Sequence, residues 1–272
     1  MRSTAVSEKR IGDTITQIKY KKDEVIVIFA SGNKIALSPE TFTDFHLFAD
    51  KEIDEEELST LLHASMMDRY YVYALKLLGK DVYSERQIQN KLFAKGADED
   101  TVWAVTKKLK ALGLIDDVLF AKTFASDIGS LRLYGKNKIL YELRLRGISP
   151  SIIASLDFPE EEERDKAFRY ASYLNRKFVK SPSEKKTFQV IRSLVARGFD
   201  ESIAEAAVAE CVSPTDQETE QKLLERYFEL SKAKYSRKYT GYQLKEKIYL
   251  DLRKKGFASR AIKATIEKGV EL

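Results

Sequence analysis

Asp116 and Asp117 are adjacent carboxylates, and they are the first residues whose type and spacing suggest acid–base chemistry. A catalytic pair has to converge on one reacting atom, whereas neighbours at the start of a helix usually point apart. Alternatively, one of them caps the next helix by accepting hydrogen bonds from its unpaired backbone N–H groups. We expect the cap.

Other residues suited to catalysis or metal binding are few. The chain has 2 histidines and 1 cysteine, a poor supply for a histidine metal site or a Ser-His-Asp site. Cys211 falls on an expected apolar helix face, and a single cysteine fits a reducing cytoplasm. The sequence contains no P-loop, dinucleotide-binding glycine motif, HExxH or paired C-x-x-C. We therefore predict no catalytic residue, no metal site, no cofactor and no enzymatic activity.

Basic side chains interleaved with tyrosines gather near residues 132–146 and 232–255. Residues 221–256 hold 11 Lys and Arg against 4 Asp and Glu. Such patches can follow a phosphate backbone and stack on bases, or they can be solvated helix ends with amphipathic tyrosines. We favour anion binding because both patches occur at the same junction of a repeat. The candidate partner- or DNA-binding residues are Arg132, Tyr134, Lys136, Lys138, Arg144, Arg146, Lys234, Arg237, Lys238, Lys245, Lys254 and Lys255.

The 272 residues suggest about two domains, or one domain with a repeat array. No apolar run approaches the roughly 18 residues of a membrane-spanning helix, and the N-terminal segment lacks the apolar stretch of a secretion signal. The net charge of +5 is uneven: residues 1–62 hold 8 Lys and Arg against 12 Asp and Glu, and the remainder 39 against 30. A basic body indicates nucleic acid or an acidic protein surface as partner, or simply a well-solvated helical surface.

The first 62 residues predict a small α+β domain. β-branched runs within residues 14–37, separated by short polar turns, predict a three-stranded antiparallel meander. Ser38 and a following proline predict a helix start, after which Phe42, Phe45 and Phe48 recur at helical spacing and should form an aromatic core. From Asp54, a D-x-x-E start resembling a capping box, the periodicity is helical to the end of the chain.

The body of the chain contains an internal repeat marked by glycines that follow a basic residue, 51, 51 and 58 residues apart. A leucine four residues before each glycine and a β-branched residue eight before it lie on one helix face. The glycine ends that helix in a left-handed turn, where the basic residue meets the helix dipole, and a capping residue then starts another helix. The glycines are Gly96, Gly147, Gly198 and Gly256; the leucines Leu92, Leu143, Leu194 and Leu252; the β-branched residues Ile88, Ile139, Val190 and Ile248; the caps Asp98, Ser149, Asp200 and Ser259.

A further helix precedes each pair, over residues 67–78, 118–133, 164–179 and 221–239. One three-helix unit of about 50 residues buries its apolar face poorly, so neighbouring units should stack. We therefore predict a mostly α fold, an elongated tandem array of three-helix repeats with a small N-terminal α+β domain of antiparallel strands. The predicted domains are 1–62 for the strand-containing domain and 63–116, 117–158, 159–213 and 214–272 for the repeats.

Over about residues 67–272 the chain resembles the RecX family of regulatory proteins. Three segments carry the resemblance: Gly-Leu-Ile-Asp-Asp-x-x-Phe-Ala at 113–121, Tyr-Gly-Lys-x-x-Ile-x-x-Glu-Leu-x-x-x-Gly-Ile at 134–148, and Ser-Glu-x-x-Ile-x-x-x-Leu-x-x-Lys-Gly at 84–96. The resemblance implies tandem three-helix repeats and a non-enzymatic protein that binds the RecA recombinase and its DNA filament, generally as an inhibitor. The strand-rich N-terminal segment resembles the longer members from low-GC Gram-positive bacteria.

Together, the patches and the resemblance predict a cytoplasmic regulator that binds the RecA–single-stranded DNA filament. It would mainly inhibit ATP hydrolysis and strand exchange in recombination, DNA repair and the SOS response. We also expect binding to single- and double-stranded DNA, no membrane association and a monomer. Two other functions stay open: a stand-alone nucleic-acid-binding helical repeat protein, and a helical adaptor for another protein.

Overall fold

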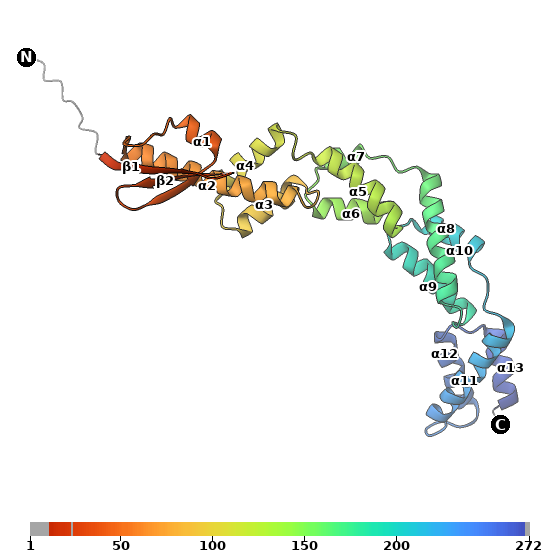
Figure 1. Ribbon diagram of the computed structural model, residues 1–272. Helices are drawn as coiled ribbons and strands as arrows, with labels where there is room; N and C mark the ends of the chain where they lie inside the picture. The colour runs from red at the N-terminus through yellow and green to blue at the C-terminus, as the bar shows by residue number, and fades with distance from the viewer. Residues whose placement is uncertain (1–10, 23, 270–272) are drawn as a thin grey trace, which may run out of the picture. The chain divides into compact units, whose positions relative to one another are not determined.

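The computed structural model describes residues 11–22 and 24–269. Over these residues it contains thirteen helices and a four-stranded antiparallel sheet near the N-terminus (Figure 1). This confirms the predicted class of fold. The described residues fall into two compact units: the first runs to Phe120 and includes Arg146–Ile148, and the second holds Ala121–Leu145 and the chain from Ser149 onward.

The sheet of the first unit has the strand order β3-β2-β1-β4. Its strands are β1 (Ile11–Tyr20), β2 (Val25–Phe29), β3 (Lys34–Leu37) and β4 (Glu52–Asp54). The three predicted strands are confirmed. The sequence did not suggest β4, because three residues are too few to show an alternating pattern.

The predicted helix start at Ser38 is confirmed: its hydroxyl accepts a backbone N–H of the first turn of α1 (Pro39–Asp44). Phe42 and Phe45 pack against the core of the sheet. Phe48 is 60% exposed, so the predicted aromatic core is wrong at this position. The reason is that α1 ends with Phe45 as its C-cap, and the helical spacing no longer applies beyond it.

A single long helix, α2 (Glu55–Leu78), serves both the sheet and the helical part of the first unit. The predicted cap Asp54 is confirmed, since its carboxylate accepts a backbone N–H of the first turn at 2.8 Å. Leu61 packs in the core of the sheet, whereas Tyr70 and Ala74 pack in a second core with the following helices. The predicted start at residue 67 is too late, and the predicted division after residue 62 falls inside this helix.

The remaining helices follow the expected order of triplets. After α2 come α3 (Glu85–Ala94) and α4 (Glu99–Ala111). The later helices are α5 (Asp117–Arg132), α6 (Lys136–Leu145) and α7 (Pro150–Ala154); α8 (Glu160–Lys177), α9 (Ser183–Ala196) and α10 (Glu201–Cys211); α11 (Gln217–Tyr235), α12 (Gly241–Lys254) and α13 (Ser259–Gly269). Within residues 67–269, which the structure describes throughout, there is no strand.

The register of the repeat is confirmed in all four middle helices, α3, α6, α9 and α12. The leucines Leu92, Leu143, Leu194 and Leu252 are all 0% exposed, as are the β-branched residues one turn before them. The glycines that follow have φ values of +93°, +78°, +90° and +85°, in chain order. These left-handed conformations favour glycine and explain why each middle helix ends where it does.

The caps of the third helices follow the prediction in part. Asp98 and Ser149 accept backbone N–H groups of α4 and α7. Asp200 stands at the N-cap of α10 but makes no capping bond; its carboxylate instead accepts a side-chain amide at 2.7 Å. Ser259 is not a cap, because α13 already includes it and its hydroxyl accepts the Tyr249 hydroxyl at 3.1 Å.

Candidate nucleic-acid and protein interface

A glycine joint holds the start of α6 in the second unit. Gly135 donates its backbone N–H to the carbonyl of Arg197, at the end of α9, over 3.0 Å. A Cβ atom on Gly198 would lie 2.2 Å from the backbone nitrogen of Lys138. Only glycine permits this approach, so the joint fixes the helix turn that carries Lys136 and Lys138.

Carboxylates from later helices complete the N-termini of three middle helices. α3, α6 and α9 each donate their first backbone N–H to an acid at the start of the helix that opens the following triplet, α5, α8 or α11. A negative charge at this end is favourable because it meets the positive pole of the helix. The pairs are Asp117 Oδ1 with Glu85 N at 2.8 Å, Glu163 Oε2 with Lys136 N at 2.8 Å, and Glu220 Oε1 with Ser183 N at 3.2 Å.

Asp116 and Asp117 do not form a catalytic pair. Asp116 caps α5, as expected, by accepting the backbone N–H groups of Val118 at 2.8 Å and Leu119 at 3.0 Å. Asp117 turns instead to α3. Burial raises the pKa of the Asp117 carboxyl, and the N–H of Glu85 opposes that shift only in part. The two side chains therefore serve separate helices.

Lys136 and Arg144 lie on one side of α6 and border an open pocket of about 330 Å³. Leu140, Ile153 and Phe158 supply apolar lining. The Lys136 ammonium lies 5.9 Å from the centre of the Phe158 ring, and both cations are exposed. Two exposed cations beside an apolar surface suit an acidic protein surface or a phosphate group.

Arg197 lies over the ring of Tyr134, the residue that the sequence suggested for base stacking. Its guanidinium lies 5.6 Å from the centre of the Tyr134 ring and 4.1 Å from that of Tyr170, and it also donates to the backbone carbonyl of Arg132. Tyr134 therefore braces the joint between α6 and α9. The sequence indicated for Arg197 only a role at the helix end, because its aromatic partners come from distant segments.

Lys138 and Arg146 of the first patch are separated from this pocket. Lys138 forms an ion pair with Glu142 at 3.0 Å and lies 5.1 Å from the ring centre of Tyr141. Arg146 belongs to the first unit, where its carbonyl accepts the hydroxyl of Ser84 at 2.6 Å. Within the first patch, Lys136 and Arg144 thus border one pocket, whereas Arg132 is exposed at the end of α5 and does not line that pocket.

The turn between α11 and α12 gathers Lys234, Arg237 and Lys238, all exposed. Lys234 lies 4.7 Å from the ring centre of Tyr235, and its hydrogen bond with that residue raises its pKa. Tyr242 follows on the first turn of α12 and is 79% exposed. The N-cap residue of α12, Thr240, makes no side-chain capping bond. This end of the helix is therefore positive and offers an aromatic ring.

The other basic residues of the second patch lie elsewhere on α12. Lys245 stands one turn into the helix and is half-buried. Lys254 and Lys255 follow at the far end, about 14 Å away from Lys245 at about 1.5 Å per residue. Lys255 forms an ion pair with Asp251 at 3.7 Å and lies 5.1 Å from the ring centre of Tyr227. The predicted second patch thus divides between the two ends of one helix.

Cys211 is half-buried and packs against the core of α8, α9 and α10, as expected of a space-filling residue. Among the residues that the structure describes, no group of three or more His, Cys, Asp or Glu could hold a metal ion. In the same part of the chain, no helix is long and apolar enough to cross a bilayer.

Comparison with known proteins points to one family. Residues 116–155 match a family model described as RecX, second three-helix domain. A regulatory protein RecX of Oceanobacillus iheyensis is 25% identical over 97% of this chain and 99% of its own length. One from Streptococcus pneumoniae is 29% identical over 89% of this chain and 94% of its own. A crystal structure of a regulatory protein RecX shares the fold, with a TM-score of 0.63 and 24% identity over 73% of this chain and all of the other.

Proposed function

Because this chain belongs to the RecX family of non-enzymatic regulatory proteins, we propose that it binds the filament of the RecA recombinase on single-stranded DNA. Binding would restrain ATP hydrolysis and strand exchange by that filament. We choose the α6 pocket as the surface that contacts the filament, because Lys136 and Arg144 lie there beside an apolar lining. That combination suits the rim of a protein interface, where cations steer the approach of an acidic partner.

The turn between α11 and α12 supplies the second contact of the proposal. Its exposed cations and the exposed ring of Tyr242 suit a DNA backbone and its bases. Four triplets with one helical register offer several such surfaces in one chain. Weak contacts at separate surfaces then add through effective concentration, and the sum exceeds what a single triplet achieves.

The test is RecA-driven ATP hydrolysis on single-stranded DNA, with and without this protein. We compare the wild type with Lys136→Glu/Arg144→Glu, and use Lys180→Glu/Arg192→Glu as the matched control. All four side chains are exposed in the second unit, but only the first pair borders the pocket. We expect the pocket variant to need about tenfold more protein for half-inhibition, equivalent to ~1.4 kcal/mol, and the control to match the wild type.

Other outcomes would point to the alternative functions. Full inhibition by a well-folded pocket variant would remove the α6 pocket from the interface. A wild type that leaves RecA unaffected but binds oligonucleotides with steep salt dependence would be a stand-alone nucleic-acid-binding protein. A wild type with neither activity would be an adaptor for another protein.

A further inference from the structure

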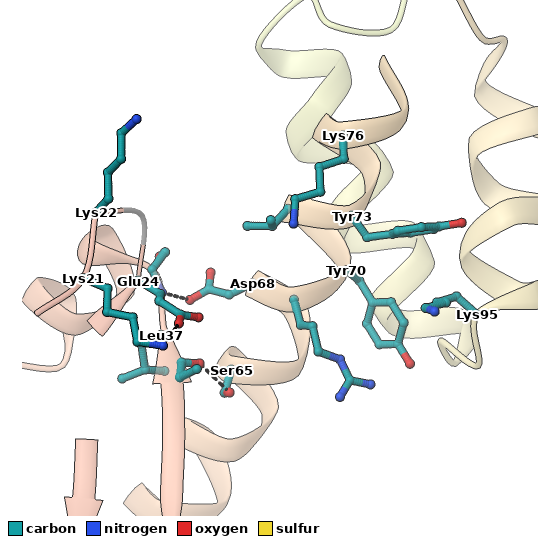
Figure 2. A pocket seen from close by; sticks show the side chains of 14 residues that line it. Lys21, Lys22, Glu24, Leu37, Ser65, Asp68, Tyr70, Tyr73, Lys76 and Lys95 are labelled. Atoms are coloured by element: carbon teal, nitrogen blue, oxygen red, sulfur yellow. Dashed lines mark hydrogen bonds and ion pairs between the residues drawn. The ribbon is translucent and has the colours of Figure 1, made fainter. Parts of the chain in front are cut away.

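A pocket of about 880 Å³ lies in the first unit. Its walls come from the hairpin between β1 and β2, from β3, from the second half of α2 and from Lys95 after α3. Figure 2 shows Lys21 and Lys22 of the hairpin on one side, and Tyr73, Lys76 and Lys95 on the other. We call this the hairpin groove.

The hairpin groove is basic, although the first 62 residues are acidic overall. Two carboxylates line it, and both are engaged in contacts within the protein. Glu24 pairs with Lys21 at 2.7 Å, and Asp68 accepts the backbone N–H of Ser38 at 2.6 Å and the hydroxyl of Thr41 at 3.1 Å. Among the described residues, no carboxylate pairs with the other lining cations, which are Lys22, Arg69, Lys76 and Lys95.

Two of those cations lie against tyrosine rings. Lys95 is 5.7 Å from the ring centre of Tyr73, and Arg69 is 5.5 Å from that of Tyr70. Tyr70 is only 3% exposed and belongs to the core, but Tyr73 is half-buried and lines the groove. A ring contact leaves the positive charge in place, so the groove presents cations beside an aromatic surface.

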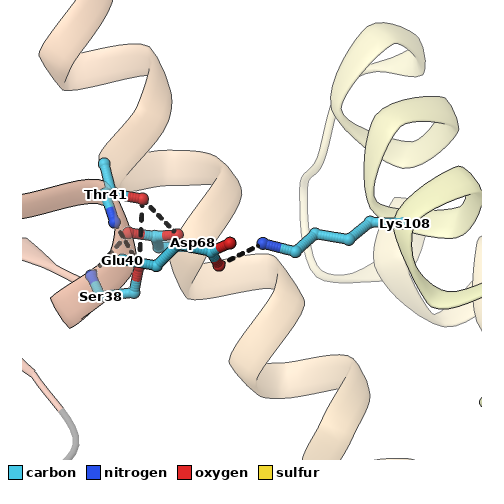
Figure 3. Close-up of polar contacts among 5 residues, drawn as sticks. All are labelled: Ser38, Glu40, Thr41, Asp68 and Lys108. Atoms are coloured by element: carbon cyan, nitrogen blue, oxygen red, sulfur yellow. Dashed lines mark hydrogen bonds and ion pairs between the residues drawn. The ribbon is translucent and has the colours of Figure 1, made fainter. Parts of the chain in front are cut away.

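Contacts at and beside the lining brace the walls of the hairpin groove. Asp68 ties α2 to the turn between β3 and α1, and Glu40 of α1 forms an ion pair with Lys108 of α4 at 2.6 Å (Figure 3). The hydrogen bond that the Lys108 ammonium donates to Glu40 raises the pKa of Lys108. These contacts therefore hold in place the elements that carry the lining cations.

We propose that the hairpin groove binds a segment of single-stranded nucleic acid through its phosphates, with a base against Tyr73. Cations from three separate elements along one groove fit a ligand whose charge repeats along its length. An extended acidic peptide would bind most readily by adding to the β3 edge. One carbonyl of that strand is already engaged, because Ser65 of α2 donates its hydroxyl to the carbonyl of Ala36 at 2.8 Å.

The test uses the full chain without RecA, so its result is independent of the proposed regulatory function. A fluorescein-labelled thymidine oligonucleotide is titrated with wild type, with Arg69→Ala/Lys76→Ala/Lys95→Ala, and with the control Lys19→Ala/Lys34→Ala/Lys80→Ala. The control residues are exposed cations of the same unit outside the groove. At about 0.7 per phosphate contact, the groove variant should lower the slope of log K against log salt by about 2. The control should change the slope by less than half of that.

A second measurement keeps the inference testable if the groove variant folds poorly. An oligonucleotide carrying iododeoxyuridine is photocrosslinked to the wild type, and we expect the crosslink in the peptide that contains Tyr73.

The same variants are titrated with a labelled oligoglutamate peptide. A folded groove variant with unchanged oligonucleotide affinity and slope would overturn the proposal. Loss of oligoglutamate binding alone would assign the groove to an acidic protein segment, and a crosslink confined to residues 121–269 would also overturn it.

Discussion

The adjacent carboxylates Asp116 and Asp117 make different contacts in this protein. Asp116 caps its own helix, whereas Asp117 reaches the first N–H of α3 and becomes partly buried there. Asp98, which caps α4, is different again: its contacts with Thr101, whose backbone N–H it accepts at 2.8 Å, lower its pKa. At the residue scale, the surroundings of each carboxylate decide how its charge affects stability.

The opposite pKa shifts predict opposite pH effects on stability. The raised pKa of Asp117 means that protonation stabilises the folded state, an effect complete below the ordinary value of 3.8 and lost as pH rises through the raised value. The lowered pKa of Asp98 means stability that is present above 3.8 and lost as pH falls through the lowered value. At neutral pH, Asp117→Asn should therefore be at least as stable as the wild type, and Asp98→Asn less stable.

Urea midpoints of the two variants, measured from neutral pH down to about pH 3, check this prediction. As the solution becomes acidic, the midpoint of Asp117→Asn should fall toward that of the wild type. The midpoint of Asp98→Asn should rise toward it. A loss of stability in Asp117→Asn at neutral pH would show that attraction to the α3 N-terminus outweighs burial. Asp116→Asn/Asp117→Asn should retain regulatory activity, since Asn also accepts backbone N–H groups.

At the scale of elements, the four middle helices repeat one design. Each buries a leucine and a β-branched residue one turn apart, and each ends in a left-handed glycine. The glycines differ in their surroundings. A Cβ on Gly147, Gly198 or Gly256 would lie 2.2–2.5 Å from another segment, whereas one on Gly96 would have its nearest neighbour, the Tyr70 hydroxyl, at 3.8 Å. Three of the four glycines thus also permit close contact between helices.

Truncating the register leucines should lower the free energy of unfolding. We expect each of Leu92→Ala, Leu143→Ala, Leu194→Ala and Leu252→Ala to cost roughly 2–5 kcal/mol, because each side chain is fully buried. Leu145→Ala is the matched control, since Leu145 lies on α6 but is 63% exposed, and it should stay within about 0.5 kcal/mol. Denaturant midpoints equal to the wild type in all four variants would contradict the register.

Alanine at the glycines should separate backbone strain from contact between helices. Gly96→Ala should cost about 1–2 kcal/mol, the strain of a left-handed alanine. Gly198→Ala has the same strain and a collision with Lys138, so it should cost at least ~1 kcal/mol more. Chemical denaturation of both variants measures the difference. Equal costs would show that α6 and α9 can move apart without penalty.

At the scale of the whole molecule, the chain combines four helical triplets with an N-terminal sheet that carries its own basic groove. Its positive surfaces are therefore distributed: the α6 pocket, the turn before α12 and the hairpin groove each involve a different part of the chain. A protein built this way gains affinity from several modest contacts, and loss of one should weaken binding without abolishing it.

Distributed contacts predict inhibition at low stoichiometry. This protein should half-inhibit RecA-dependent ATP hydrolysis at less than one molecule per recombinase subunit, because the proposed contacts on separate parts of one chain would engage more than one subunit. A titration at RecA concentrations well above the dissociation constant measures the ratio directly. A ratio of one or more would mean that each molecule acts on a single subunit.

The helical register, most of the caps and the N-terminal strands could be predicted from the sequence, because they depend on residues within about two helical turns of one another. Leu194 and Gly198, for example, are four positions apart, and the same spacing recurs in the other triplets. Likewise, Asp116 caps a helix that begins at the next residue. Near neighbours along the chain stay near neighbours in any helix, so the pattern is sufficient.

Only the tertiary structure decided which charged groups are engaged and which are displayed. Glu163 meets the N-terminus of α6 across 27 residues of sequence, and Arg197 meets the carbonyl of Arg132 across 65. The hairpin groove likewise joins Lys21, from a segment whose composition suggested an acidic surface, to Lys95 of the helical part of the chain. Charges interact through space over a few ångströms, and composition counts them without their distances. The fold therefore determines where this protein is positive.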